Sequence, residues 1–451
     1  MGLDSLIIKY STPGPRYTSY PTAPQWSDGI GESEYRQALA RVNPADPLAL
    51  YIHLPFCEKL CYYCGCNIQI TGDKNRSRPY VEQVKNELAA VAQALGSRRR
   101  LTQVSWGGGT PTFLSLNEIE DLHTATRAHF DLDDDAEVSI EIDPRVTTND
   151  QLALLREQGF NRTSLGVQDF DPKVQEAINR IQPAAVTAAM LEECRRLGYD
   201  GINFDLIYGL PWQSLQTFRA TVDAVIAMGP DRIALYNYAR LPSLLKHQVI
   251  LEKFPMPSAE ERVAIFTMAL ERLTAAGYVT IGMDHFAKKE DSLSKALERG
   301  TLYRNFMGYT VKQGSHLLGV GTSAIGEVGG GFFQNVRKAA DYEAVIASGK
   351  LATMRGLVLT DDDQRRKWVI QSLMCRFELS ADAFRRELGG ELETVFAEEL
   401  AGLRGFLADG ILEGSGGQWK VTERGRLFVR NVAMVFDAYL QNQKATFSKT
   451  V

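Results

Sequence analysis

Between residues 48 and 240, short apolar or β-branched runs alternate with longer amphipathic stretches, and this alternation limits the fold more than any other feature of the chain. The runs predict six strands, over residues 48–53, 103–106, 137–142, 163–167, 202–207 and 233–236. The stretches between them predict helices over residues 80–94, 116–129, 148–158, 185–197 and 214–228. Strands that alternate with helices form a parallel sheet with right-handed crossovers. The predicted fold class is α/β, as an incomplete (β/α)6 barrel or a flat, doubly wound sheet, which periodicity alone does not separate.

The residues that follow the predicted strands are polar or glycine-rich. In both architectures, ligands bind outside the carboxyl ends of the strands. Gly108 and Gly109 follow the second strand, where missing side chains let backbone N–H groups approach a ligand closely. The third to sixth strands carry Glu141, Gln168, Asp205 and Arg240, in that order, toward or just beyond their carboxyl ends. Any one of these groups is compatible with ordinary packing, but their recurrence at successive strand ends predicts a ligand site.

Cysteines follow the first predicted strand. Cys57, Cys61 and Cys64 have a C-x3-C-x2-C spacing, with Cys66 directly after them. Three close thiolates suit an iron–sulfur cluster, which is usually held by four soft ligands, so one iron would stay open to a substrate or cofactor. A zinc site needs a closed set of four ligands and is less favoured here, as are disulfides. We expect the first three cysteines to be the ligands and Cys66 to lie beside the cluster, with Cys66 replacing one of them as the alternative.

Composition limits the class of protein and its partners. The chain has 451 residues, of which 44% are hydrophobic and 23% charged, which predicts a globular protein with a sizeable core. A net charge of −5 gives no electrostatic case for nucleic acid. Residues 1–10 lack the apolar stretch of a signal peptide and no run approaches a membrane span, so we expect a cytoplasmic location and no membrane partner. Cys194 and Cys375 have apolar neighbours, which predicts buried packing.

Two segments lie on either side of the predicted core of residues 48–240. In residues 1–47, the prolines and the glycine between Thr12 and Pro24 disfavour a helix and predict an extended arm. Residues 241–360 are expected to form a helical connector followed by a further segment. Within it, His285 follows an apolar stretch and is by default a satisfied core histidine.

A change of pattern at residue 361 predicts a separate, mostly helical C-terminal unit, 361–451. Its features are a helix cap at Asp361, Asp362 and Asp363, helices over 366–376 and 393–407, two short strands around the glycines of 410–417, and a helix from Glu423. This order looks like a winged helix, a unit that often binds DNA. The fourteen acidic and thirteen basic residues from position 361 onward make no basic footprint, so a packing role as a lid or base is favoured.

The cysteine loop resembles the signature of the radical S-adenosylmethionine (SAM) enzymes. The longer string from Tyr51 to Cys66 reads Tyr-Ile-His-Leu-Pro-Phe-Cys-x3-Cys-x-Tyr-Cys-Gly-Cys. It resembles one branch of these enzymes, the oxygen-independent coproporphyrinogen III oxidases of haem synthesis. The Cys-Gly-Cys at the end of this string separates the two branches, because the sister branch of haem chaperones typically has Cys-x-Phe at this position. The arm around Arg16, Tyr17 and Tyr20 is also similar to that of the oxidases, and the haem chaperones generally lack it.

The resemblance implies a radical SAM barrel, a 4Fe-4S cluster on Cys57, Cys61 and Cys64, and two bound SAM molecules. It matches the following residues to family positions that line SAM: Gly108, Gly109, Thr110, Glu141, Gln168, Arg180, Asp205, Ala239 and Ile325. Tyr51 and Tyr63 match neighbours of the site, and we take Cys66, Tyr51 and Arg240 as the catalytic candidates. The chain departs from the family at Tyr63, where many members have Phe, and at Arg240, where many have His.

The resemblance also implies a reaction. An electron from the reduced cluster cleaves SAM to methionine and a 5′-deoxyadenosyl radical, which removes a hydrogen from the β-carbon of a propionate. Loss of CO2 and one electron leaves a vinyl group, and two rounds turn coproporphyrinogen III into protoporphyrinogen IX. The four carboxylates of this substrate predict polar contacts, for which the candidates are Arg16, Arg240, Arg304, Asp284, His285 and Asn305.

Other functions stay open at the level of sequence. A haem-binding chaperone, or a radical enzyme that opens or methylates haem, would share the barrel and the iron–sulfur cluster. A DNA-binding regulator is a more distant alternative. The partners we expect are coproporphyrinogen III and an electron donor that the sequence does not identify, with no nucleic acid. We expect a monomer because no exposed heptad seam is present.

Overall fold

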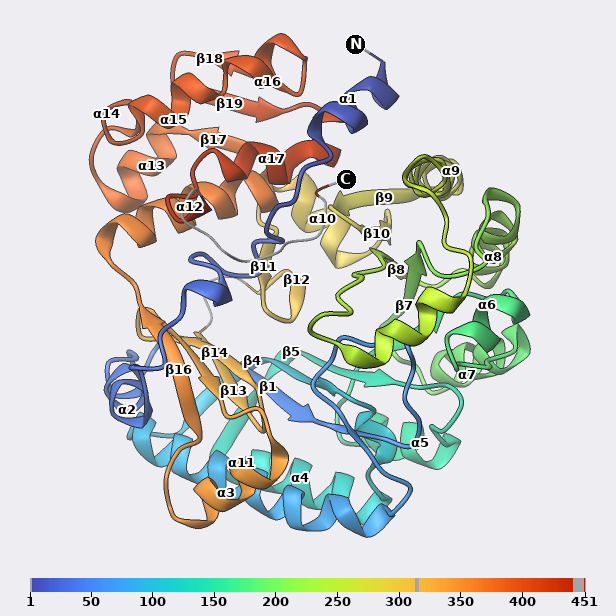
Figure 1. The fold of residues 1–451 in the computed structure, drawn as a ribbon. Coiled ribbons are helices and arrows are strands. Elements are labelled where there is room, and N and C mark those ends of the chain that lie inside the picture. The colour runs from blue at the N-terminus through green and yellow to red at the C-terminus, as the bar shows by residue number, and fades with distance from the viewer. Residues whose placement is uncertain (1, 313–315, 441–449, 451) are drawn as a thin grey trace.

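The computed structural model describes residues 2–312, 316–440 and 450 (Figure 1). Parts of the predicted arm, connector segment and C-terminal unit, namely Met1 and residues 313–315, 441–449 and 451, lie outside the described residues. The largest element is a sheet of twelve strands in the order β16-β15-β14-β13-β1-β4-β5-β6-β7-β8-β10-β9. No helix in the described ranges has both the length and the apolar character needed to cross a membrane.

Six parallel strands form the centre of the sheet. They are β1 (Leu48–Leu54), β4 (Arg99–Gly108), β5 (Phe130–Ile142), β6 (Arg162–Gln168), β7 (Gly201–Tyr208) and β8 (Arg232–Asn237). Each contains one of the predicted strands. A doubly wound sheet reverses its strand order at a switch point, whereas these strands lie side by side in chain order. This order identifies an incomplete (β/α)6 barrel, and the predicted fold class is confirmed.

The connecting helices lie on the outer side of the barrel (Figure 1). They are α3 (Ser77–Leu95), α4 (Leu116–His129), α5 (Asn149–Glu157), α6 (Pro172–Ala177), α7 (Ala184–Arg196) and α8 (Leu215–Met228). Side-chain caps begin several of them. At α4 the Ser115 hydroxyl accepts from the Glu118 N–H, and the Glu118 carboxylate accepts from the Ser115 N–H. Because these caps depend only on residues close in sequence, the predicted helices agree with the observed ones to within a few residues.

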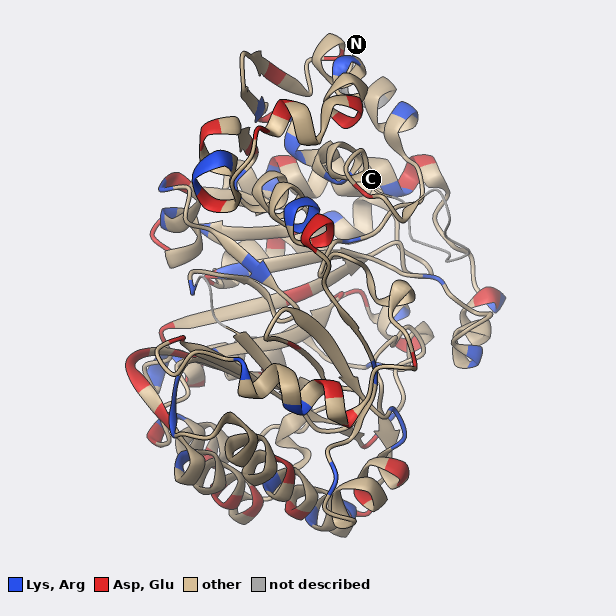
Figure 2. Cartoon of the chain, turned by 90° about the vertical axis from the view of Figure 1, so that its left-hand side faces the viewer, with Lys and Arg blue, Asp and Glu red and all other residues tan. Residues whose placement is uncertain are grey.

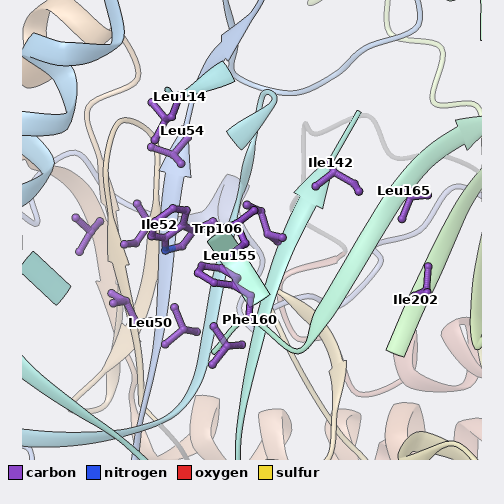
Figure 3. Close-up of a cluster of buried hydrophobic side chains, with 14 of the residues drawn as sticks. Leu50, Ile52, Leu54, Trp106, Leu114, Ile142, Leu155, Phe160, Leu165 and Ile202 are labelled. Atoms are coloured by element: carbon purple, nitrogen blue, oxygen red, sulfur yellow. The ribbon is translucent and has the colours of Figure 1, made fainter. Parts of the chain in front are cut away.

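A hydrophobic core fills the space between the sheet and these helices (Figure 3). Leu50, Ile52 and Leu54 alternate along β1 and are buried in it. Trp106 of β4 meets Phe160 edge to face, with ring centroids 5.0 Å apart. Because successive side chains of a strand point to opposite faces, the residues between them face the barrel interior. The same alternation therefore builds the core and supplies the side chains of the site.

The sheet continues beyond β1 with strands that sequence patterns did not predict. The strand β13 (His316–Val320) pairs with β1 in parallel, and β14 (Ile325–Val328), β15 (Gly331–Asn335) and β16 (Thr353–Val358) follow in antiparallel order. At the other edge, β10 (His285–Lys288) pairs antiparallel with β8, and β9 (Tyr278–Gly282) pairs antiparallel with β10. The segment from 241 to 360 thus extends the barrel wall on both sides.

Other elements of this segment connect these strands. They are η4 (Lys246–Lys253), α9 (Ala259–Ala275), α10 (Ser292–Glu298), the hairpin of β11 (Tyr303–Asn305) and β12 (Gly308–Thr310), and α11 (Ala339–Ala347). In Figure 1 the hairpin lies in the middle of the molecule, between the barrel and the C-terminal helices.

A buried carboxylate joins the extension to the barrel. Glu87 of α3 accepts hydrogen bonds from the Gly321 N–H (2.8 Å), the Asn335 amide (2.7 Å) and the Tyr342 hydroxyl (2.7 Å). Burial nevertheless raises the pKa of Glu87 to about 7. Beside it, the Tyr80 hydroxyl donates to the His53 carbonyl (2.7 Å). The turn after β13 is therefore fastened to the end of β1, where the cysteine loop begins.

The N-terminal arm begins with α1 (Leu3–Tyr10) and ends with η1 (Ala23–Gln25) and α2 (Glu32–Ala40). The stretch between α1 and η1 has no helix, as its prolines predicted. It runs between the barrel and the C-terminal helices (Figure 1). Arg304 Nη1 donates to the carbonyls of Arg16 (2.9 Å) and Tyr17 (3.1 Å), and the Tyr17 hydroxyl donates to Asp437 (3.0 Å). The arm thus bonds to the β11–β12 hairpin on one side and to the C-terminal part on the other.

The C-terminal part combines helices with a small sheet. Its elements are α12 (Asp361–Arg376), β17 (Glu378–Ser380), α13 (Ala381–Leu388), α14 (Leu392–Val395), α15 (Ala397–Gly402), α16 (Arg404–Ala408), β18 (Leu412–Ser415), β19 (Gln418–Val421), η5 (Arg424–Phe428) and α17 (Val429–Met434). The antiparallel β18 and β19 are the predicted strand pair, and β17 pairs with β19.

Three local predictions in this part differ from the structure in detail. The N-cap of α12 is Thr360, whose hydroxyl accepts from the Asp363 N–H (3.1 Å), while the predicted cap residue Asp363 completes the capping box by accepting from the Thr360 N–H (3.0 Å). The helix predicted over 393–407 is broken into three, since Phe396 leaves helical geometry to pack against Phe384 with ring centroids 5.9 Å apart. The helix expected from Glu423 starts as a 3-10 turn. In each case tertiary packing or a neighbouring cap overrides local propensity.

Glu87→Ala tests the buried link. The substitution leaves the Gly321 N–H, the Asn335 amide and the Tyr342 hydroxyl without an acceptor, so we expect a loss of about 3–5 kcal/mol in the free energy of unfolding. Urea unfolding measures it. The matched control is Glu82→Ala in the same helix, where an exposed ion pair with Lys85 costs about 0.5 kcal/mol or less. Equal effects of the two substitutions would contradict a specific role of Glu87.

Candidate active site

The cysteine loop is held at both of its ends. It leaves the barrel through β2 (Phe56–Cys57) and returns through β3 (Gln69–Ile70), which pairs with β2 in parallel. The Gln69 N–H donates to the Pro55 carbonyl (2.7 Å), and the Thr71 N–H donates to the Cys57 carbonyl (2.9 Å). The three spaced cysteines therefore lie on a loop whose two stems are joined directly above β1.

Neighbouring elements hold the middle of the loop. The Asn179 side chain, after α6, donates to the Leu60 carbonyl (2.8 Å). From η4, Gln248 donates to the Tyr63 carbonyl (3.0 Å), and His247 Nε2 lies 2.7 Å from the Cys64 carbonyl oxygen. Because these contacts are to backbone oxygens, they fix the path of the loop and leave the thiols unoccupied by the anchors.

The thiols open into a cavity of about 630 Å³ at the carboxyl ends of the central strands. The predicted residues that line it are Cys57, Cys61, Tyr63, Cys64, Cys66, Gly108, Gly109, Thr110, Glu141, Gln168, Arg180 and Asp205. The volume is that of a pocket for a small molecule or cofactor. Residues from five strands and the cysteine loop are thus brought together, as the rule for parallel sheets predicts.

Cationic side chains approach the thiol of Cys61. Arg180 Nη1 lies 3.7 Å from its sulfur and Arg145 Nη2 lies 3.8 Å from it. Both guanidinium groups also bind Asp143, at 3.0 Å and 2.6 Å. The two guanidinium groups therefore place positive charge beside the Cys61 sulfur. Hydrogen bonding from Cys66 lowers the pKa of Cys64 to about 7, while burial raises the pKa of Cys57 to about 11.

The glycine loop after β4 lies directly against the cysteine loop. The Gly109 N–H donates to the Leu54 carbonyl (2.9 Å), and the Thr110 hydroxyl lies 3.5 Å from the Cys57 sulfur. Gly108 has φ +112°, and a Cβ there would lie 2.5 Å from the His53 ring. The Gly108 N–H donates to Glu141 (2.9 Å). The missing side chains are needed for this close approach of two loops and a carboxylate.

Besides the cysteine loop, two carboxylates and Arg180 line the cavity. Burial raises the pKa of Glu141 to about 7 and raises the pKa of Asp205, although Ser164 and Asn203 donate to Asp205 at 3.0 Å and 2.8 Å. Arg180 Nη2 donates to the Gly166 carbonyl (2.6 Å). The cavity wall therefore offers both acceptors and a guanidinium to a polar ligand.

The residues present fit an iron–sulfur cluster with SAM beside it. The donor set is three soft thiols on one cavity, which suits iron. Two buried polar atoms of the lining, Gln168 Oε1 and Arg180 Nε, have no hydrogen-bond partner among the residues that the structure describes, and they suit a ligand with both donors and acceptors. No group of three or more His, Cys, Asp or Glu residues in the described ranges converges as ligands of a single ion do. A multi-iron cluster does not require such convergence, because each ligand binds a different iron.

Four predicted site residues do not line this cavity. Tyr51 lies beneath it, with its hydroxyl 3.1 Å from His53 Nδ1. The Ala239 carbonyl accepts from the Gln248 side chain (3.2 Å), and Ile325 begins β14. Arg240 is exposed and forms an ion pair with Glu252. Tyr51 and Ala239 are therefore linked to the site indirectly, through His53 and Gln248, whereas Arg240 is turned toward the surface.

The candidate substrate contacts are already engaged with one another. Arg16 forms an ion pair with Asp284, whose pKa stays well below its usual range, because the charges of Arg16 and His285 outweigh the effect of burial. His285 Nδ1 lies 2.7 Å from Asp284. Arg304 binds the arm, and the Asn305 amide donates to Gln103 (3.3 Å). The cations that face the cavity are instead Lys59, Arg145 and Arg180.

Arg145 and Ser164 are among the lining residues that sequence reasoning missed. Arg145 lies three positions after the predicted third strand. It was therefore predictable from the rule that ligands bind outside the carboxyl ends of parallel strands. Ser164 lies inside a strand, and only its inward orientation, which depends on register, distinguishes it.

Two family models match the chain. Residues 51–225 match the Radical SAM superfamily, and residues 359–428 match the HemN C-terminal domain. Oxygen-independent coproporphyrinogen III oxidase of Pseudomonas aeruginosa is 44% identical over 99% of this chain and 98% of its own length. The enzyme of that name from Salmonella typhimurium is 43% identical over 98% of this chain and 96% of its own length.

The chain belongs to the oxygen-independent coproporphyrinogen III oxidase family of the radical SAM superfamily. A solved structure, coproporphyrinogen III oxidase (HemN) from Escherichia coli, described as a radical SAM enzyme, superposes with a TM-score of 0.92 at 40% identity. The match covers 97% of this chain and 99% of that one. The family likeness therefore extends over the arm, the barrel and the C-terminal part. Membership of the radical SAM superfamily implies a 4Fe-4S cluster and SAM as cofactors.

Gly108→Ala tests the close contact of the two loops. The new methyl group meets the His53 ring, and alanine is strained at this φ, so we expect about 1–3 kcal/mol of strain and a weakened SAM site. Equilibrium binding of SAM to the reconstituted protein measures the effect, with a rise of about tenfold in Kd expected from that energy.

Gly96→Ala is the control. Gly96 also has a positive φ, +74°, but has open space around its Cβ position at the end of α3. We expect it to lower stability without changing the Kd for SAM. If Gly108→Ala binds SAM as the wild type does, the glycine loop does not shape the SAM site.

Proposed function

We propose that this chain catalyses the oxygen-independent oxidative decarboxylation of coproporphyrinogen III. Two propionate side chains become vinyl groups, which gives protoporphyrinogen IX for haem synthesis. The observation that carries the proposal is the cavity of about 630 Å³, where three thiols of one loop face the glycine loop and Arg180. Relatives that match over nearly their whole length bear the name of this activity, which supports the same assignment.

Cys57, Cys61 and Cys64 would hold the cluster, and the cavity wall would hold SAM. When bound, these groups supply a reducing electron and a 5′-deoxyadenosyl radical that removes a hydrogen atom from the substrate. Arg180 offers its guanidinium to a carboxylate, while Glu141 and Asp205 accept hydrogen bonds. We further propose that two SAM molecules bind, as the resemblance to the family implies.

The protein contributes orientation and exclusion of water. Each round takes one hydrogen atom from a β-carbon, releases CO2 and passes one electron to an acceptor. We assign catalytic roles to Cys66, which lies on the cavity, and to Tyr51 beneath it. A catalytic role for Arg240 requires that its side chain leave Glu252, to which it is bound at the surface.

The alternatives are less well supported. The haem chaperone and the haem-modifying enzyme share the barrel, but the relatives matched over the full length are named as oxidases. For a DNA-binding regulator a basic surface is required. Figure 2 instead shows Lys and Arg interspersed with Asp and Glu on one side of the molecule. We also propose a cytoplasmic, monomeric enzyme that takes electrons from a separate donor.

The product assay tests the proposal. Anaerobically reconstituted protein is incubated with SAM, a reductant and coproporphyrinogen III, and protoporphyrinogen IX and 5′-deoxyadenosine are followed together. We expect both products from the wild type. Cys61→Ser loses a cluster ligand and should form neither, a loss of at least about 100-fold in rate, as expected when a group that acts as part of a unit is removed.

Cys194→Ser is the control, because Cys194 is buried behind β6, with the Thr163 hydroxyl 3.8 Å from its sulfur. It should keep both products. Deoxyadenosine without protoporphyrinogen IX in the wild type would preserve the radical chemistry and reject this substrate. Neither product from protein that carries its full iron content would favour the haem-binding function.

A further inference from the structure

One arginine lies on the interior face of the sheet extension, in register with Tyr51. Tyr51 of β1 pairs with Gly319, Ile325 pairs with Gln334, and Gln334 pairs with Arg355. A Cβ on Gly319 would touch the Ile325 backbone, so those two are also neighbours. Residues that pair across a sheet point to the same face. These five residues therefore form one row that starts beneath the cavity and, at about 4.8 Å per strand, extends about 19 Å along the wall.

Arg355 has only neutral partners among the described residues. Its Nε donates to the Gln334 side-chain oxygen (2.7 Å), and its guanidinium lies over the Trp26 ring, 5.7 Å from the centroid. Asp28 is the acidic side chain whose charge acts on it, but Asp28 is exposed and makes no ion pair with it in the described part of the chain. Arg16 and Arg240, by contrast, are both paired with carboxylates.

A second guanidinium increases the positive potential at this point. Burial, and after it the charge of Arg337, lower the pKa of Arg355. Arg337 itself is exposed, and its carbonyl accepts from the Asn67 side chain (2.8 Å), which ties it to the end of the cysteine loop. Two cations held near one another repel, and an anion that binds between them removes that cost. The wall therefore favours an anionic group at the end of the row that is farther from the cysteine loop.

The side chains packed around Arg355 are aromatic, and two of them, Trp26 and Phe332, are buried. Trp26 stacks on Phe332 with ring centroids 5.4 Å apart and meets Phe306 at 5.8 Å. A guanidinium beside such rings suits a carboxylate on a large cyclic ligand, because its fork binds both oxygens at once. We infer that Arg355, assisted by Arg337, binds a propionate carboxylate of the tetrapyrrole substrate. This inference rests on the proposed function and assigns one of its substrate contacts.

Arg355→Gln tests it. The variant loses a charge-assisted hydrogen bond to substrate, so we expect KM for coproporphyrinogen III to rise about tenfold. We expect kcat, iron content and KM for SAM to change by less than about twofold, because the residue does not line the SAM cavity. Arg355→Lys, which keeps the charge without the fork, should give an intermediate KM. Arg219→Gln, on the exposed face of α8, is the control and should leave KM unchanged.

A binding measurement separates this inference from the proposed function. Coproporphyrin III, the stable oxidised form, is titrated with the wild type and Arg355→Gln, alongside its uncharged tetramethyl ester. We expect the wild type to bind the tetracarboxylate more tightly than the ester. In the variant, the ratio of the Kd for the ester to the Kd for the tetracarboxylate should be about tenfold smaller. An unchanged preference, or a raised KM for SAM alone, would overturn the inference. If the wild type binds coproporphyrin III but forms no protoporphyrinogen IX, the proposed function fails. The titration with coproporphyrin III and its ester still decides the role of Arg355.

Discussion

Three thiols have to be held on one side of a cofactor cavity while the other side stays free for a ligand, and the remainder of the site depends on that arrangement. A loop alone is too mobile for this purpose. Here the two stems of the cysteine loop pair with each other, and Asn179, His247 and Gln248 bind its carbonyls from two further elements. The anchors take the backbone oxygens and leave the sulfur atoms for metal.

The barrel supplies the opposite side of the cavity through its strand ends. Gly108, Glu141 and Asp205 belong to different strands, and all of them reach the cavity because parallel strands end at the same edge. The extension from β13 to β16 is fastened beside β1 by Glu87. This arrangement gives the wall one continuous interior face, from Tyr51 at the cysteine loop to Arg355 near the arm.

The central barrel was predictable from the sequence because its strands are short apolar runs separated by well-capped helices. Half of the lining residues followed from the strand ends and the cysteine spacing, together with the family resemblance. The strand β13 was not predictable, since His316–Val320 becomes a parallel neighbour of β1 only through contacts with distant residues such as Tyr80 and Glu87. The partners of charged side chains were not predictable either, because they come from distant parts of the chain. Arg16 and Arg304 have the chemistry of substrate contacts, and only the fold reveals that Asp284 and the arm already occupy them.

We propose that the three cysteines leave one iron of the cluster free to bind SAM. Electron-nuclear double resonance of the reduced protein, with SAM labelled with ¹⁵N in its methionyl amino group, tests it most directly. The account predicts a ¹⁵N coupling to the cluster in the wild type that persists in Cys66→Ser. A cluster that shows no coupling in the wild type, although SAM is bound, would mean that a fourth protein ligand closes that iron, and the account would be wrong.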